Sequence, residues 1–317
     1  MPFAQFVLNR LAGALLMLVA VSALVFLMTD VLPGDVASRI LGRNPDPEKL
    51  AILRERLSLD QPLFSRYLGW LGGAFTGDFG VSLISGQPVS EIVGRRLFNS
   101  CLLAALAFLI YLPLAVIPAV VQATHRDRAV DQAISGVALA ILSIPDFLLG
   151  TILLILFASV WPVAPARATI DSAMGWIETI RAMILPAVTV ALVMGTYAMR
   201  YLRDSLIEAL DTEYVRIARL NGIPERLVLW RHALPNALVP AINITSLNLT
   251  YLFGGVVVVE QVFAFPGFGA LLVGSLMQLD IPVIQATVLI AAAVYILGNL
   301  LADIAAMALN PRLRHAG

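Results

Sequence analysis

Long uncharged runs of hydrophobic residues dominate the chain and are separated by polar segments. A helix needs about 20 apolar residues to cross the hydrocarbon core of a bilayer, because each residue rises about 1.5 Å. The pattern therefore predicts an all-α integral membrane protein with six transmembrane helices. The predicted spans are residues 11–29, 97–124, 134–159 (interrupted by Asp146), 182–199, 233–259 and 281–302.

A seventh uncharged stretch, residues 261–279, contains Pro266 and Gly267 near its start. A turn at this pair would leave backbone polar groups that lipid cannot satisfy. We therefore expect a loop outside the cytoplasm that carries a short, partly buried helix, rather than a further span.

The arginines of the short loops predict the orientation, because cytoplasmic loops carry an excess of basic residues. With both termini cytoplasmic, the short outside loops hold Arg167 and Arg181. The long loop of residues 30–96 is discounted, since long loops translocate largely regardless of charge. The predicted inside segments hold Arg10, Arg126, Arg128, Arg200, Arg203, Arg216, Arg219, Arg226, Arg231, Arg312 and Arg314.

Three regions follow from this topology. Residues 1–96 are expected to form the first helix, kept as an anchor, and a helical loop outside the cytoplasm. Residues 97–307 form the core transmembrane domain, and residues 308–317 a cytoplasmic tail. Within the long loop, the order of acidic and basic residues predicts a helix over residues 45–59, and Gly77-Asp78-Phe79-Gly80 predicts a turn.

The composition argues against nucleic-acid binding, a metal site and nucleotide binding by a P-loop. The 317 residues are 59% hydrophobic and 13% charged, with a mean hydropathy of +0.87, and 21 basic residues balance 21 acidic ones, which argues against a nucleic-acid surface. Cys101 is the only cysteine, and the three histidines are far apart, so no metal site is expected. The only lysine, Lys49, does not follow a glycine as in a P-loop. We expect this chain to bind no cofactor and to be no enzyme; any ATP and Mg²⁺ would be used by partner subunits.

The longest predicted cytoplasmic segment, residues 200–232, contains the signals of a short helix. Asp211 or Thr212 is placed to cap its start, and Glu213 lies in its first turn, where an acidic residue is favourable. Gly222 is expected to end it, because glycine adopts the left-handed conformation without a steric penalty.

One face of this helix is apolar. Tyr214, Ile217 and Ala218 share it by i, i+3 and i+4 spacing, and Pro224 suits the first turn of a second helix. Such a ridge below a membrane domain suits insertion into a groove on a partner.

This segment resembles the EAA loop of ATP-binding-cassette importer permeases, and more narrowly that of the dipeptide, oligopeptide and nickel permease group. Residues 214–222 and 232–240 carry the resemblance; Asn221 stands where that group usually has lysine. The resemblance implies that ATPase subunits are coupled through Glu213, Tyr214, Arg216, Ala218, Arg219, Gly222, His232 and Pro235.

The resemblance extends over nearly the whole chain, through short segments at residues 32–35, 59–63, 77–82, 143–147, 259–269 and 310–314. It implies a type I importer in a bacterial inner membrane, with a second homologous permease, two ATPase subunits and an extracytoplasmic binding protein that delivers substrate. Di- or oligopeptides are the expected substrate, and nickel or another small solute is the alternative within the family.

Other polar residues are candidates for the pathway. Asp146 is costly within a span and faces either substrate, a neighbouring subunit or a hydrated cavity. Asn243 and Asn248 belong to a polar stripe that either lines the pathway or bonds neighbouring helices. An outer gate is the third candidate, formed by Arg95, Arg96 and Glu260.

Two other classes of membrane protein are less consistent with the sequence. An ion-driven secondary transporter would use Asp146 as its coupling site, but no convincing internal repeat is seen. A membrane-embedded hydrolase built on Ser143, Asp146 and His232 is disfavoured, because the predicted topology places His232 in the cytoplasm.

Overall fold

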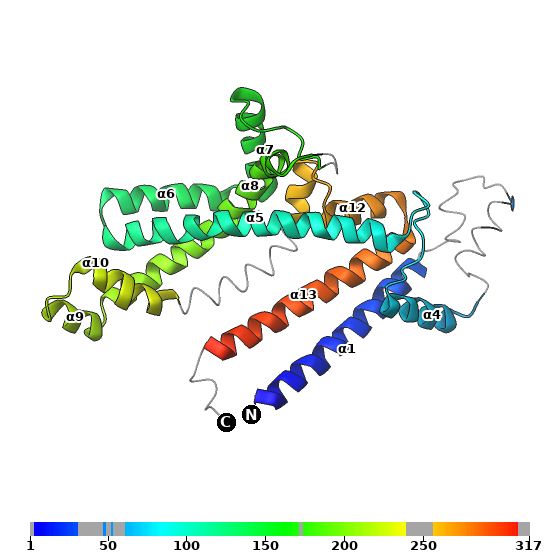
Figure 1. Ribbon diagram of the computed structural model, residues 1–317, viewed down its shortest axis with the longest axis horizontal. Helices are drawn as coiled ribbons and strands as arrows, with labels where there is room; N and C mark the ends of the chain where they lie inside the picture. The colour runs from blue at the N-terminus through cyan, green and yellow to red at the C-terminus, as the bar shows by residue number, and fades with distance from the viewer. Residues whose placement is uncertain are drawn as a thin grey trace. The chain divides into compact units, whose positions relative to one another are not determined.

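The computed structural model describes residues 3–30, 47–48, 52, 61–170, 174–238 and 256–309, and these residues are largely helical (Figure 1). The all-α prediction is confirmed for this part of the chain. Its elements are α1 (Phe3–Asp30), α4 (Leu63–Thr76), α5 (Val89–Thr124), α6 (Ala129–Ser143), α7 (Asp146–Leu154), η1 (Ile155–Val160), α8 (Trp176–Leu210), α9 (Glu213–Leu220), α10 (Glu225–Leu227), η2 (Val228–Ala233), α12 (Phe268–Gln278) and α13 (Ile281–Leu309).

Among the described residues, four helices are long and apolar enough to cross a membrane, and they contain the first, second, fourth and sixth predicted spans. Their membrane-spanning stretches are Val7–Thr29, Val89–Thr124, Trp176–Leu210 and Ile281–Leu300. Most of the fifth predicted span, including Asn243 and Asn248, lies outside the described residues. The predicted helix over residues 45–59 and the tail from residue 310 also lie outside them.

The third predicted span is not one straight helix. The helices Ala129–Ser143 and Asp146–Val160 meet at an angle of 105°. The break lies at Pro145, which has no backbone N–H to donate and which holds Ile144 in an extended conformation (φ −96°, ψ 128°). Asp146 therefore opens α7, where the helix dipole favours a carboxylate, and the prediction that it interrupts a continuous span is corrected.

The chain divides into two compact units. In the unit that contains residues 99–270, α8 is central, and Met183 on α8 belongs to one apolar core with Tyr111 on α5 and with Phe263 and Phe265. Gly195 lets α8 approach α5 closely, because a Cβ there would lie 3.3 Å from the Cβ of Leu114.

The other unit contains residues 4–98 and 271–297. The predicted turn is confirmed, with Gly77 and Gly80 at φ values of 81° and 80°. The loop that follows is held by Asp280, which accepts hydrogen bonds from the Ser82 hydroxyl at 2.5 Å and from the Leu83 N–H at 3.1 Å.

The short helix predicted after Pro266 and Gly267 is also present. It is α12, an apolar helix too short to count as a membrane span and only partly buried. The interpretation of residues 261–279 as a turn followed by a short helix is therefore confirmed in its secondary structure.

Candidate coupling site

Helix α9 follows α8 after a two-residue connection and lies at its end (Figure 1). Thr212 occupies the N-cap position, as one of the two predicted alternatives. Its hydroxyl, however, donates to the Ala209 carbonyl at 2.5 Å and makes no capping bond to α9. Glu213 lies in the first turn of α9, as predicted, where its negative charge interacts favourably with the helix dipole.

The end of α9 is fixed by Gly222, which has a φ of 76°. The Gly222 N–H donates to the Arg219 carbonyl at 3.0 Å, and the Ile223 N–H donates to the Ala218 carbonyl at 3.2 Å. These two bonds form a Schellman motif, which turns the chain sharply at a left-handed residue. The prediction that Gly222 ends the helix is confirmed.

One face of α9 is buried against the segment that follows it. Val215, Ala218 and Val228 form a small buried cluster, with Leu210 and Ile223 packed against it. The predicted ridge therefore needs a correction, because Ala218 lies on this buried face and not on the exposed one. Side chains three residues apart share a face, so the burial of Val215 carries Ala218 inward with it.

The exposed apolar ridge instead consists of Tyr214, Ile217 and Leu220, which are 42%, 55% and 79% exposed. Leu227 and Trp230 add exposed apolar surface on the next segment, where Pro224, Arg226, Leu227 and Trp230 line an open hollow of about 470 Å³. An apolar ridge with an adjacent hollow is the kind of surface that other proteins bind.

The hairpin between α9 and α10 is closed by an ion pair. The Arg219 guanidinium donates to both carboxylate oxygens of Glu225, with its Nε 3.1 Å from each. This hydrogen bonding raises the pKa of Arg219. Both side chains are considerably exposed, so the pair adds little stability but holds the hairpin in one geometry.

A second set of bonds joins the start of α9 to η2 and the residues after it. The Tyr214 hydroxyl donates to the His232 carbonyl at 3.3 Å, and the Asn236 amide donates to the same carbonyl at 2.7 Å and to the Tyr214 hydroxyl at 3.0 Å. His232 thus contributes its backbone here, and Pro235 beside it is exposed. Sequence reasoning did not single out Asn236, although it lies in the segment that carries the resemblance.

Sequence reasoning also missed a buried polar network at the base of the same unit. The Arg203 guanidinium on α8 donates to both carboxylate oxygens of Asp131 on α6, at 2.8 and 2.6 Å. The Gln122 amide on α5 donates to Asp131 Oδ1 at 3.0 Å, and the Asp127 N–H donates to Oδ2 at 3.1 Å. Asp131 and Gln122 are buried, so one carboxylate joins three helices.

An exposed ion pair lies nearby. Arg126, in the connection between α5 and α6, reaches Asp211, the residue after α8, at 3.0 Å. The α5–α6 connection is therefore bonded to α8 through Asp131 and to the start of the α9 segment through Arg126.

Glu260 organises a separate loop. Its buried carboxylate accepts hydrogen bonds from the Ser100 hydroxyl and from the Ala270 N–H, the latter at 2.8 Å. The Ser100 hydroxyl in turn accepts a bond from the Phe268 N–H at 2.7 Å. A Cβ at residue 267 would collide with the Glu260 carboxylate, so glycine is required there for the loop to close on it.

Comparison with known proteins decides the family. Residues 111–315 match the model of the family described as binding-protein-dependent transport system inner membrane component, and residues 3–104 match that of its N-terminal part. A relative from Brucella abortus (strain 2308), provisionally named a peptide transport system permease protein, is 38% identical over 98% of both chains. The glutathione transport system permease protein GsiC of Escherichia coli (strain K12) is 33% identical over 98% of this chain and 99% of its own length.

The chain belongs to this family. It is a multi-pass inner-membrane permease with the type I fold of ATP-binding-cassette importers, and permeases of this family work with partner subunits. The resemblance drawn from the sequence is thereby confirmed.

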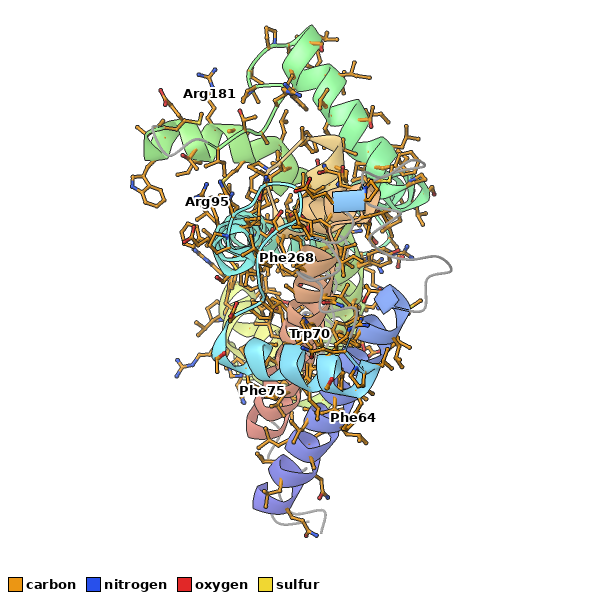
Figure 2. All side chains as sticks on the ribbon, turned by 90° about the vertical axis from the view of Figure 1, so that its right-hand side faces the viewer. Phe64, Trp70, Phe75, Arg95, Arg181 and Phe268 are labelled. Atoms are coloured by element: carbon orange, nitrogen blue, oxygen red, sulfur yellow. The ribbon has the colours of Figure 1, made fainter. Side chains whose placement is uncertain are left out.

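The predicted pathway and gate residues that the structure describes lie on different elements of the permease. Asp146 is half-buried at the start of α7. Arg95 is exposed and Arg96 is half-buried on α5, and Figure 2 labels Arg95. Their roles, and that of Glu260, remain predictions. Among the described residues no group of three or more His, Cys, Asp or Glu side chains is placed to hold a metal ion.

Proposed function

We propose that this permease is one of two homologous subunits that form the translocation pathway of an ATP-driven importer for short peptides. The remaining subunits would be two ATPases and an extracytoplasmic binding protein. The observation that carries the proposal is the exposed ridge of Tyr214, Ile217 and Leu220, mounted on a hairpin whose two ends are fixed. A rigid, exposed apolar projection suits a groove on an ATPase.

The proposed mechanism is a difference in contact between two states. ATP closes the ATPase dimer, and the closed dimer must bind the ridge better in the outward-facing state, because a ligand shifts an equilibrium only by its difference in affinity. The buried contact between α9 and Val228, together with the Arg126–Asp211 pair, would pass that movement to the helices. The chain has no P-loop lysine, so ATP is hydrolysed by the partners.

The proposal requires α9 to face the cytoplasm, with both termini on the same side. The distribution of arginines supports this orientation, since the α9 segment alone carries Arg216, Arg219, Arg226 and Arg231. Cytoplasmic loops of membrane proteins carry such an excess of basic residues.

Peptides are proposed as substrate because one relative is provisionally named a peptide permease and another a glutathione permease, glutathione being a tripeptide. Nickel or another small solute is the alternative within the family. An ion-coupled carrier that uses Asp146 is the alternative from another class.

The test is reconstitution of the purified transporter in liposomes with its binding protein. We expect ATP hydrolysis to rise when the binding protein is loaded with a short peptide or glutathione, and not when Ni²⁺ is supplied alone. Stimulation by Ni²⁺ but by no peptide would refute the substrate. Uptake that follows a proton or sodium gradient without ATPase subunits would refute the importer mechanism itself.

A further inference from the structure

Helix α4 has two distinct apolar faces, and only one of them is packed. Tyr67 and Trp70 pack on Phe26 near the end of α1, with ring centroids 5.5 and 5.7 Å away. The Tyr67 hydroxyl lies 2.8 Å from the Ser22 hydroxyl, which fixes α4 against α1. These contacts lie within one compact unit of the chain.

The second apolar face forms a stripe of Phe64, Leu68, Leu71 and Phe75, at the i, i+4, i+7 and i+11 spacing of one helix side. Phe64 is 70% exposed and Phe75 is 75% exposed. Figure 2 shows Phe64 and Phe75 on one edge of α4 and Trp70 on the other.

A second exposed side of α4, about 100° around the helix from the stripe, is small and polar. It consists of the exposed residues Ser65, Gly69, Gly72 and Thr76. The helix contains no acidic residue, and its only charge is Arg66, whose guanidinium lies 5.7 Å from the Phe26 ring centre. The helix therefore separates an apolar side from a small polar side, as helices at a membrane surface do.

The depth of α4 follows from its contacts with α1. The apolar stretch of α1 that is long enough to cross a membrane ends at Thr29, which we take as the end of the span. Phe26 lies three residues and Ser22 seven residues before that end, or about 5 and 10 Å at the helical rise. This is the depth, about 5–10 Å, at which the apolar face of a surface-lying helix is buried in a bilayer. Tyr67 and Trp70 are also the residue types enriched at that boundary.

We propose that α4 lies flat in the membrane–water interface at the end of α1, with its Phe64–Phe75 stripe in the acyl chains and its Ser65–Thr76 side toward water. The 14 residues of α4 are about 21 Å long, too short to cross the hydrocarbon core. The partner of this surface is the lipid bilayer. Its function is to anchor the loop between α1 and α5 at a fixed depth.

The test uses single cysteines in the assembled transporter, reconstituted in phospholipid vesicles. Cys101 is the only cysteine of this chain, so Cys101→Ala leaves this subunit without a native cysteine, and it is labelled before the other subunits are added. Spin labels are placed on the stripe with Phe64→Cys, Leu68→Cys and Phe75→Cys, and on the polar side with Ser65→Cys, Gly69→Cys and Thr76→Cys. All six positions are exposed, which makes them suitable for labelling.

Collision of each label with oxygen, which concentrates in lipid, is compared with collision with a water-soluble nickel chelate. We expect the ratio of oxygen to nickel collisions to be several-fold higher at the stripe than at the polar side. Equal ratios on both sides would overturn the proposal. Stripe labels that neither reagent reaches would also overturn the proposal, because a protein would then cover the stripe. Repeating the measurement without binding protein shows whether the binding protein or the second permease covers it. The measurement needs no transport, so its outcome is independent of the proposed substrate.

Discussion

An Asp131→Ala variant is expected to lose most of its thermal stability margin and its transport activity. The substitution leaves the Arg203 guanidinium, which is only 22% exposed, without the carboxylate that binds it through two nitrogens. Removal of one partner from a buried ion pair costs about 3–5 kcal/mol. The exposed carboxylate of Asp204, 2.9 Å from Arg203 Nη1, still pairs with the guanidinium, so we expect a loss near the lower end of that range. Melting of the purified permease in detergent, followed by tryptophan fluorescence, measures the loss.

The exposed pair Arg126–Asp211 is the matched control. Its side chains are 51% and 68% exposed, so Asp211→Ala should change the melting temperature very little. Replacing both members of the buried pair, Asp131→Ala with Arg203→Met, should restore part of the stability, since no half-buried guanidinium is then left without its buried carboxylate. Wild-type melting of Asp131→Ala would show that the buried network does not hold α5, α6 and α8 together.

A Gly222→Val variant is expected to insert and to bind ATPase subunits but to lose about tenfold in coupled transport. A left-handed conformation costs a β-branched residue on the order of 1–2 kcal/mol, and 1.4 kcal/mol corresponds to a factor of ten. No atom lies within 4 Å of a Cβ built at residue 222, so the penalty is purely conformational. If residue 222 leaves the left-handed conformation to avoid this penalty, the chain turns differently and α9 points in another direction. Peptide uptake per ATP hydrolysed in liposomes is the measurement.

Asparagine supplies the control at the same position. Asn adopts the left-handed conformation more readily than other residues with a side chain, so Gly222→Asn should keep most of the coupling. Equal activity of the valine and asparagine variants would mean that the Schellman turn does not position α9.

The sequence was sufficient to predict the elements whose signals are local. The spans within α1, α5, α8 and α13 are long uncharged runs, and the end of α9 follows from Gly222 alone. Helix α9 could be located because a cap position, an acidic first turn and a glycine stop coincide within a few residues.

The remaining features depend on contacts between distant residues. Arg203 and Asp131 are separated by 72 positions in the sequence. A charged residue near the end of an apolar run is equally consistent with an unpaired position in a loop. The inward face of α9 was misassigned at Ala218 because alanine fits either a buried or an exposed face, and the packing of Val215 against Val228 decides between them. The size of the bend at Pro145 is likewise set by packing, whereas proline alone predicts only a break.

Cross-linking from α9 shows whether this helix contacts an ATPase subunit. A photoreactive side chain is placed at Ile217, which is 55% exposed, or at Phe75 on α4, which is 75% exposed, and the assembled transporter is irradiated in native membranes. We expect a cross-link to an ATPase subunit from position 217 and none from position 75. Cross-links from 217 only to the binding protein, or to no ATPase at all, would contradict this expectation.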